Sequence, residues 1–130
     1  IALAQAKKIT VDLKVEDGIF VRGDEDALRI MICNVIDNAV HYTPEMGRID
    51  ASLTEQDGRS IFEIQDTGPG IAASERERVF DRFYRLDGSA GTGSGLGLAI
   101  VKRIAQTHGA KIVLSDRAPQ TGLRIQLIFS

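Results

Sequence analysis

The sequence predicts an α+β fold, in which a mixed, mostly antiparallel sheet is covered on one face by about three helices as a two-layer α/β sandwich. Alternating apolar and polar residues, typical of half-buried strands, recur along the chain. Two longer helical runs interrupt these strands, and short glycine-containing turns join neighbouring ones. The 130 residues suffice for one domain with its own core, residues 1–130.

Six strands are expected, over residues 8–14, 19–21, 48–54, 59–66, 111–114 and 123–129. Turn signals join two pairs of them as hairpins, with Asp17 and Gly18 in the first and residues 56–58 in the second. The last strand alternates most clearly, because every second residue from 123 to 129 is apolar.

Three helices are expected between these strands. Asp24 is the predicted N-cap of the first helix, which ends near residues 41–42 because Pro44 disfavours helix at the residue before it. Ser74 begins a short acidic helix. The third follows a glycine cluster and ends at Gly109, a typical left-handed helix stop.

Composition excludes several classes of function. The 16 basic and 18 acidic residues give a net charge of −2, which offers no electrostatic basis for binding nucleic acid or an anionic membrane. One cysteine and two histidines argue against a Cys/His zinc site, and Cys33, within an apolar run, is expected in the core. No run of 18 apolar residues and no signal peptide appears, which is typical of a cytosolic domain.

Polar residues follow one side of the first helix. Its expected buried face holds Leu28, Ile32, Val35, Ile36 and Ala39. Asn34, Asn38 and His41 fall about a third of a turn away. Asparagine is unfavourable inside helices because its amide competes with the backbone. The spacing alone leaves two interpretations open: the amides face solvent, or their oxygens hold Mg²⁺ together with water and phosphate.

Asp66 ends an apolar strand and is followed by Thr-Gly-Pro-Gly. Its carboxylate either caps a tight turn or accepts a hydrogen bond from the exocyclic amine of a bound base, with Thr67 and the backbone of Gly68 and Gly70 completing the pocket. An aspartic-protease dyad would require a second Asp-Thr-Gly from another chain. That third interpretation leaves the asparagines unexplained.

A second glycine cluster, Gly91, Gly93, Gly95 and Gly97, precedes the third helix. Glycines accept positive φ angles, and a helix that begins directly after them directs its free N–H groups toward an anion. The cluster therefore predicts a loop that holds phosphate. It matches neither the P-loop pattern nor the dinucleotide pattern G-x-G-x-x-G, since residue 98 is leucine.

Four motifs occur in a recognisable order. They are N-x-x-x-N-A from residue 34, D-T-G-P-G-I from 66, V-F-D-R-F-Y-R from 79 and G-S-G-L-G-L-A-I-V from 93. Together they closely resemble the catalytic ATP-binding domain of sensor histidine kinases, in the wider family that includes gyrase, the ninety-kilodalton heat-shock chaperone and MutL. The resemblance implies a Bergerat-type fold with a flexible ATP lid over about residues 86–92.

The resemblance also assigns roles to residues. Asn34, Asn38 and His41 are the implied catalytic residues, the two asparagines being the Mg²⁺ ligands and His41 replacing a basic residue that reaches the phosphates. Asp66 is the residue that reads the adenine amino group. Further ATP contacts are implied for Asn38, Tyr42, Gly68, Gly70, Ile71, Phe83, Arg85, Gly93, Ser94, Gly95, Leu96, Gly97, Leu98 and Thr121.

Family members that hydrolyse ATP have a glutamate where this chain has Asn34, and an amide cannot serve as a general base. The resemblance thus implies a protein histidine kinase that transfers the γ-phosphate of Mg-ATP to a histidine on a helical dimerisation domain outside this chain, for relay to a response regulator. The chain alone is expected to be a monomer that does not autophosphorylate.

The full-length kinase is expected to be a homodimer, and this part of it a cytoplasmic domain of an inner-membrane sensor. The alternative is a nucleotide-dependent interaction module, either an anti-sigma-type serine kinase or a degenerate ATP-binding domain.

Overall fold

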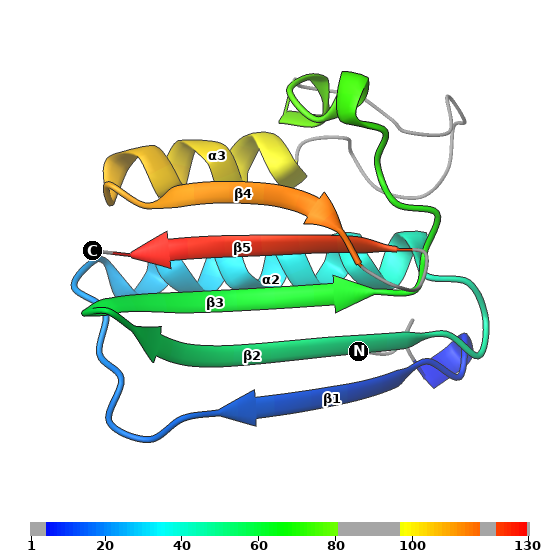
Figure 1. Ribbon diagram of the computed structural model, residues 1–130, viewed down its shortest axis with the longest axis horizontal. Coiled ribbons are helices and arrows are strands. Elements are labelled where there is room, and N and C mark those ends of the chain that lie inside the picture. Colours follow the sequence, from blue (N-terminus) through cyan, green and yellow to red (C-terminus); the bar gives the residue numbers. More distant parts are fainter. Residues whose placement is uncertain (1–4, 81–96, 118–121, 130) are drawn as a thin grey trace.

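The computed structural model describes residues 5–80, 97–117 and 122–129 (Figure 1). A five-stranded sheet of order β1-β2-β3-β5-β4 forms one layer. Its strands are β1 (Thr10–Val15), β2 (Arg48–Gln56), β3 (Arg59–Asp66), β4 (Lys111–Asp116) and β5 (Leu123–Phe129). Only β1 and β2 pair in parallel within this sheet, so the predicted mixed, mostly antiparallel arrangement is confirmed.

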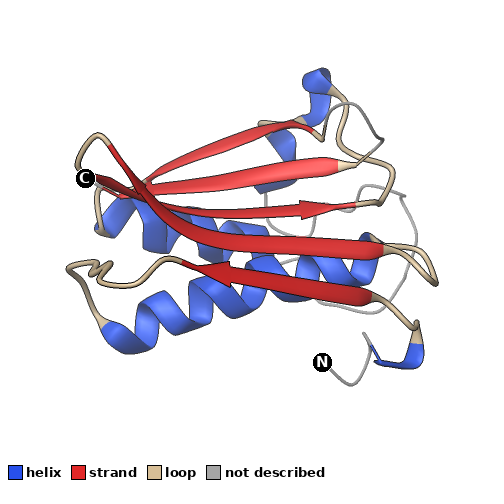
Figure 2. Cartoon of the chain, turned by 60° about the horizontal axis from the view of Figure 1, so that its bottom comes forward, coloured by secondary structure: helices blue, strands red, loops and turns tan. Residues whose placement is uncertain are grey.

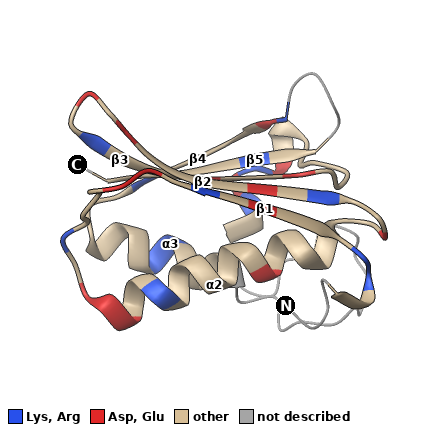
Figure 3. Ribbon diagram, turned by 90° about the horizontal axis from the view of Figure 1, so that it is seen from below, with Lys and Arg blue, Asp and Glu red and all other residues tan. Residues whose placement is uncertain are grey.

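Two helices form the second layer, α2 (Glu25–Tyr42) and α3 (Gly97–Thr107) (Figures 2 and 3). Asp24 caps α2 as predicted, because its side chain accepts a hydrogen bond from the Asp26 amide at 3.1 Å. The short helix expected at Ser74 is instead a pair of 3₁₀ turns, Ala73–Glu75 and Arg78–Phe80. Ser74 lies inside the first turn rather than capping it.

The core fills the space between the layers. Its most deeply buried apolar side chains are Met31, Val35, Ile49, Ile64, Val101 and Leu127. On α2 the buried stripe is centred on Met31, Val35 and Ala39, while the predicted Leu28, Ile32 and Ile36 are half-buried beside it. Cys33 lies on the solvent side of the helix, so its expected place in the core is wrong.

The first predicted hairpin does not form. Residues 19–21 make no strand, and β1 pairs with β2 in register from Thr10 opposite Arg48. Because α2 returns the chain along the sheet, the connection from β1 to β2 is a β-α-β crossover, which makes the two strands parallel. Val21 packs against the core, whereas the Phe20 side chain is 90% exposed.

His108 joins the two helices at the end where α3 stops. Its Nδ1 lies 2.8 Å from the Ile104 carbonyl oxygen, and its Nε2 lies 3.1 Å from the backbone nitrogen of Asp24. A carbonyl only accepts and an amide only donates, so the neutral ring with its proton on Nδ1 satisfies both contacts. The N-cap of α2 is thereby tied to the last turn of α3.

Candidate functional site

Several elements meet at one end of the sheet, on the right in Figure 1. There β3 and β4 end, β5 begins, α2 ends and α3 begins. A pocket at this end is lined by Asn38, Tyr42, Asp66, Pro69, Gly70, Ile71 and Leu123. Five of the residues predicted to bind nucleotide, which are far apart in the sequence, therefore share one pocket.

Among the described residues that line this pocket, Asp66 is the only charged one, and it is 5% exposed. One carboxylate oxygen, Oδ1, accepts hydrogen bonds from the backbone amides of Gly68 at 2.8 Å and Leu123 at 3.4 Å. The other oxygen, Oδ2, has no hydrogen-bond partner among the described residues. Every fully buried polar side-chain atom among the described residues has a hydrogen-bond partner. Because Oδ2 has none, it is not fully buried and is accessible to a ligand.

Burial raises the pKa of Asp66 above the ordinary value of an aspartate. The hydrogen bonds from Gly68 and Leu123 and the positive charge of Arg117 act in the opposite direction on this pKa. A poorly solvated carboxylate with one oxygen already satisfied is well suited to accept a hydrogen bond from a ligand, since such a bond has little water to compete with.

Glycines allow three backbone segments to close around this carboxylate. Gly122 has φ +140°, and a Cβ on it would overlap the carbonyl oxygen of Asp66. A Cβ on Gly68 would lie 2.8 Å from the Tyr42 carbonyl oxygen, and one on Gly70 would lie 3.1 Å from that of Gly122. Gly122 is not among the residues predicted from the sequence, although a glycine directly before a strongly alternating strand is a signal for such a close approach.

The two asparagines occupy one edge of α2, and both are half-buried. Asn34 donates from Nδ2 to the carbonyl oxygen of Ile30 at 2.9 Å, which leaves its Oδ1 without a partner among the described residues. Asn38, one turn later, lines the pocket with Asp66. No cluster of three His, Cys, Asp or Glu side chains in the described part of the chain could hold a metal. Two amide oxygens fit Mg²⁺, which takes oxygen ligands and keeps positions for water and phosphate.

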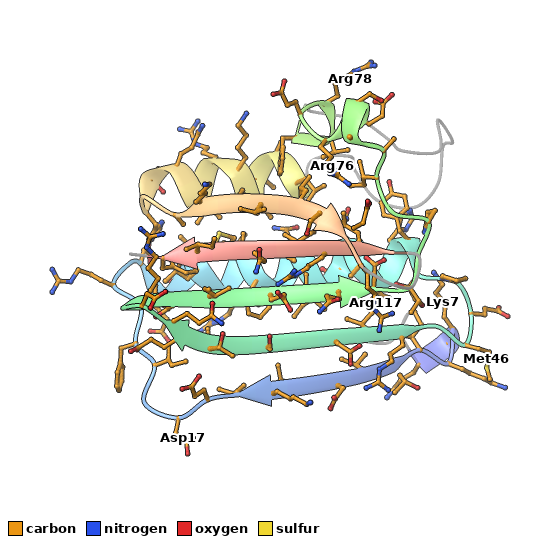
Figure 4. The ribbon with its side chains drawn as sticks, viewed as in Figure 1. Lys7, Asp17, Met46, Arg76, Arg78 and Arg117 are labelled. Atoms are coloured by element: carbon orange, nitrogen blue, oxygen red, sulfur yellow. The ribbon has the colours of Figure 1, made fainter. Side chains whose placement is uncertain are left out.

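The last turn of α2 brings further polar groups to the same end. The His41 ring meets the Tyr42 ring edge-on, with 4.8 Å between centroids. Lys7 donates from Nζ to the carbonyl oxygens of Val40 at 2.9 Å and His41 at 3.1 Å (Figure 4). A lysine at this position satisfies the free carbonyls and complements the negative end of the helix dipole.

The remaining predicted site residues fall into two groups. The side chains of Ile71 and Leu98 belong to the core, and Gly97 is the first residue of α3. The Thr67 hydroxyl accepts a hydrogen bond from the Arg48 amide at 3.0 Å, so it extends the β2–β3 pairing at the start of β2. Phe83, Arg85, Gly93, Ser94, Gly95, Leu96 and Thr121 lie outside the described residues.

Comparison with known proteins identifies relatives of the chain. A family model described as "Histidine kinase-, DNA gyrase B-, and HSP90-like ATPase" matches residues 23–130. The sensor protein kinase PmrB of Pseudomonas aeruginosa is 34% identical over an alignment 131 residues long, gaps included, which covers 96% of this chain and 28% of PmrB. The chain thus spans little more than a quarter of that relative.

Two solved structures are similar as well. The mycobacterial sensor histidine kinase MprB is 34% identical with a TM-score of 0.87, over 98% of this chain and 88% of that chain. Full-length ShkA in complex with AMPPNP is 32% identical with a TM-score of 0.83, over 98% of this chain and 27% of that chain. In the described residues, no helix combines the length and apolar character needed to cross a membrane.

Proposed function

This chain belongs to the histidine kinase-, DNA gyrase B- and HSP90-like ATPase family, among whose members it is similar to sensor histidine kinases, and from this premise we propose that it binds Mg-ATP and donates the γ-phosphate to a histidine on a helical domain outside the chain. The observation that carries the proposal is the buried carboxylate of Asp66, whose Oδ1 is held by two backbone amides while Oδ2 has no partner among the described residues.

In this proposal Asp66 selects the base. Its Oδ2 accepts a hydrogen bond from the exocyclic amine of adenine, while Tyr42, Ile71 and Leu123 supply the less polar walls of the pocket. Guanine has a carbonyl at the corresponding ring position, and two acceptors facing each other in a poorly solvated pocket repel. Adenine is therefore favoured because the polar group in the pocket would otherwise remain unpaired.

The phosphates extend from this pocket along the edge of α2. Asn34 and Asn38 would hold Mg²⁺ through their amide oxygens, and the ion when bound neutralises phosphate charge. Asn34 cannot deprotonate water, which supports transfer to a protein acceptor over hydrolysis. The acceptor nitrogen attacks the γ-phosphorus as the bond to the bridging oxygen breaks, and ADP leaves.

The larger assembly is proposed on the same basis. We infer that the chain is the ATP-binding part of a longer sensor kinase, homodimeric through its helical domain, which passes the phosphoryl group to a response regulator. The solved cytoplasmic segment of the histidine kinase QseC is 27% identical to this chain with a TM-score of 0.70, and this likeness supports a cytoplasmic position.

Calorimetric titration with ATP, ADP and GTP, with and without Mg²⁺, tests the proposal. The expected result is saturable binding of the two adenine nucleotides, weak or no binding of GTP, and negligible release of phosphate. Equal affinity for GTP would refute the role of Asp66, and rapid phosphate release would refute the argument from Asn34. Adenine-selective binding without phosphoryl transfer to the helical domain would favour the interaction module.

A further inference from the structure

An ion pair on the open face of the sheet lies directly behind the proposed adenine pocket. Arg117 follows the last residue of β4, and its Nη2 lies 3.0 Å from Oδ2 of Asp50 on β2 (Figure 4). The ion pair joins the segment after β4 to β2, although β5 and β3 lie between these two strands in the sheet. It is 12% exposed, far less than a typical surface arginine.

Gly122 lies under the Arg117 side chain. The Arg117 amide donates to the Gly122 carbonyl oxygen at 3.1 Å, which continues the β4–β5 pairing by one residue. The Cδ atom of Arg117 would lie 3.4 Å from a Cβ on Gly122, so the arginine stem covers the glycine. The backbone that Arg117 covers is the backbone that packs against Asp66.

The far end of the ion pair is itself fixed. Arg48 binds Asp50 at 2.9 Å and Asp12 of β1 at 3.4 Å, and its carbonyl oxygen accepts the Thr67 amide at 3.1 Å. Asp50 therefore has two partners, Arg117 from beyond β4 and Arg48 of its own strand, and Arg48 in turn pairs with Asp12 of β1. A nearly buried, hydrogen-bonded ion pair on a fixed partner restrains geometry more than an exposed pair does.

We propose that Arg117 is a positioning residue for base recognition. Its ion pair with Asp50 and the hydrogen bond from its backbone amide to the Gly122 carbonyl oxygen hold the start of β5. As a result the Leu123 amide stays on Oδ1 of Asp66, and Oδ2 remains directed at the ligand. The inference rests on the proposed adenine-binding function. Without this restraint the Leu123 amide, already at 3.4 Å, moves away and Oδ1 competes with Oδ2 for the ligand amine.

The test compares ATP with purine riboside triphosphate, which lacks the exocyclic amine. Arg117→Ala is expected to weaken ATP binding about fivefold, as for the loss of one well-oriented hydrogen bond, and to change binding of the analogue less than about twofold. Arg117→Lys is expected to restore most of the ATP affinity. Asp50→Asn, which keeps the shape of its side chain, is expected to reproduce the effect even if Arg117→Ala folds poorly.

Arg124→Ala is the matched control. Arg124 lies on the same face next to Leu123 and pairs with Glu63 at 2.7 Å, but no bond joins its side chain to Gly122 or Asp50. An equal loss of both nucleotides in the Arg117 and Asp50 variants, or the same selective loss in Arg124→Ala, would overturn the inference. Failure of the unaltered chain to distinguish the two nucleotides would overturn the proposed function instead.

Discussion

The proposed nucleotide site has two ends, which we call the base end and the metal end after the parts of Mg-ATP that we propose they bind, and the two ends are built differently. At the base end, backbone amides from two segments hold one side chain, Asp66, and glycine 122 packs directly against its main chain. At the metal end, the polar groups are side chains on one edge of α2, and Asn34 is held by a hydrogen bond to the Ile30 carbonyl oxygen of its own helix. The first arrangement depends on two segments that are far apart in the sequence, and the second depends on one helix.

This difference sets what each end contributes to binding. A carboxylate held by backbone donors loses little conformational entropy when a ligand arrives, so its bond to the ligand adds fully to affinity. Amides on a helix edge gain most of their partners from the ligand and its ion. Substitutions at the base end are therefore expected to affect both stability and selectivity, whereas those at the metal end affect mainly ion-dependent affinity.

The largest expected effect is on folding. Gly122→Ala places a methyl group on the Asp66 carbonyl oxygen at a φ of +140°, so we expect the free energy of unfolding to fall by about 3 kcal/mol or more in urea denaturation. Gly58→Ala is the control, because its φ is +77° but a Cβ there meets nothing within 4 Å. A similar cost for the two substitutions would mean that the base end is not tightly packed.

Asp66→Asn tests binding at the same end. The asparagine amide keeps the shape of the side chain, but it turns either an uncharged carbonyl oxygen or an NH2 donor toward the adenine amine. ATP affinity is therefore expected to fall about 100-fold, or about 3 kcal/mol. Calorimetric titration measures this, and affinity within about threefold of the original would exclude Asp66 from reading the base. Because burial disfavours the ionised acid, the variant is expected to fold at least as stably at neutral pH.

The pH dependence of stability provides a second measurement on Asp66. Its pKa is raised in the folded state, so the folded chain holds this proton more tightly than the unfolded chain does. The stability contributed by Asp66 is then fully present below the unfolded pKa and is lost as pH rises through the folded pKa. Relative to Asp66→Asn, the unaltered chain should lose stability across that window, and the opposite slope would contradict the assigned direction.

The sequence predicts the local elements well because local signals specify them. The N-cap at Asp24 and the left-handed Gly109 act within a few residues and lie where they were predicted, and the turn predicted at residues 56–58 forms at residues 57–58. The hairpin at residues 19–21 fails because its alternative, pairing of β1 with β2, depends on residues more than thirty positions away. Strand pairing over that distance leaves no local trace in the sequence.

The same distinction applies to the pocket. Asp66 and the asparagines can be found from motifs because their chemistry requires particular residue types. Arg117 and Lys7 cannot be found in this way, because their roles depend on contacts that only the folded chain makes. Arg117 contacts Asp50 on β2, and Lys7 contacts the end of α2. A residue that acts by holding others in place is recognised by its contacts, and those contacts become known only from the structure.

At the metal end, Asn38→Ala is expected to weaken ATP binding about tenfold in Mg²⁺ and less than twofold in EDTA, because only the ion-bound form loses an oxygen ligand. Asp37→Ala, on the exposed side of the same helix, is the control and should leave both values unchanged. Equal losses in Mg²⁺ and EDTA would assign Asn38 to the pocket wall rather than to the ion.

The smallest expected effect is at His41, which the sequence resemblance places where a basic residue is expected to reach the phosphates. A guanidinium is always charged and presents a planar fork of donors that binds phosphate through two hydrogen bonds, which an imidazole ring cannot offer. His41→Arg is therefore expected to raise ATP affinity about threefold at pH 7.5, the scale of one partly exposed charge contact. AMP, whose single phosphate lies nearer the base, should bind unchanged. A gain that appears equally for AMP would place residue 41 at the base end and remove the division between the two ends of the pocket.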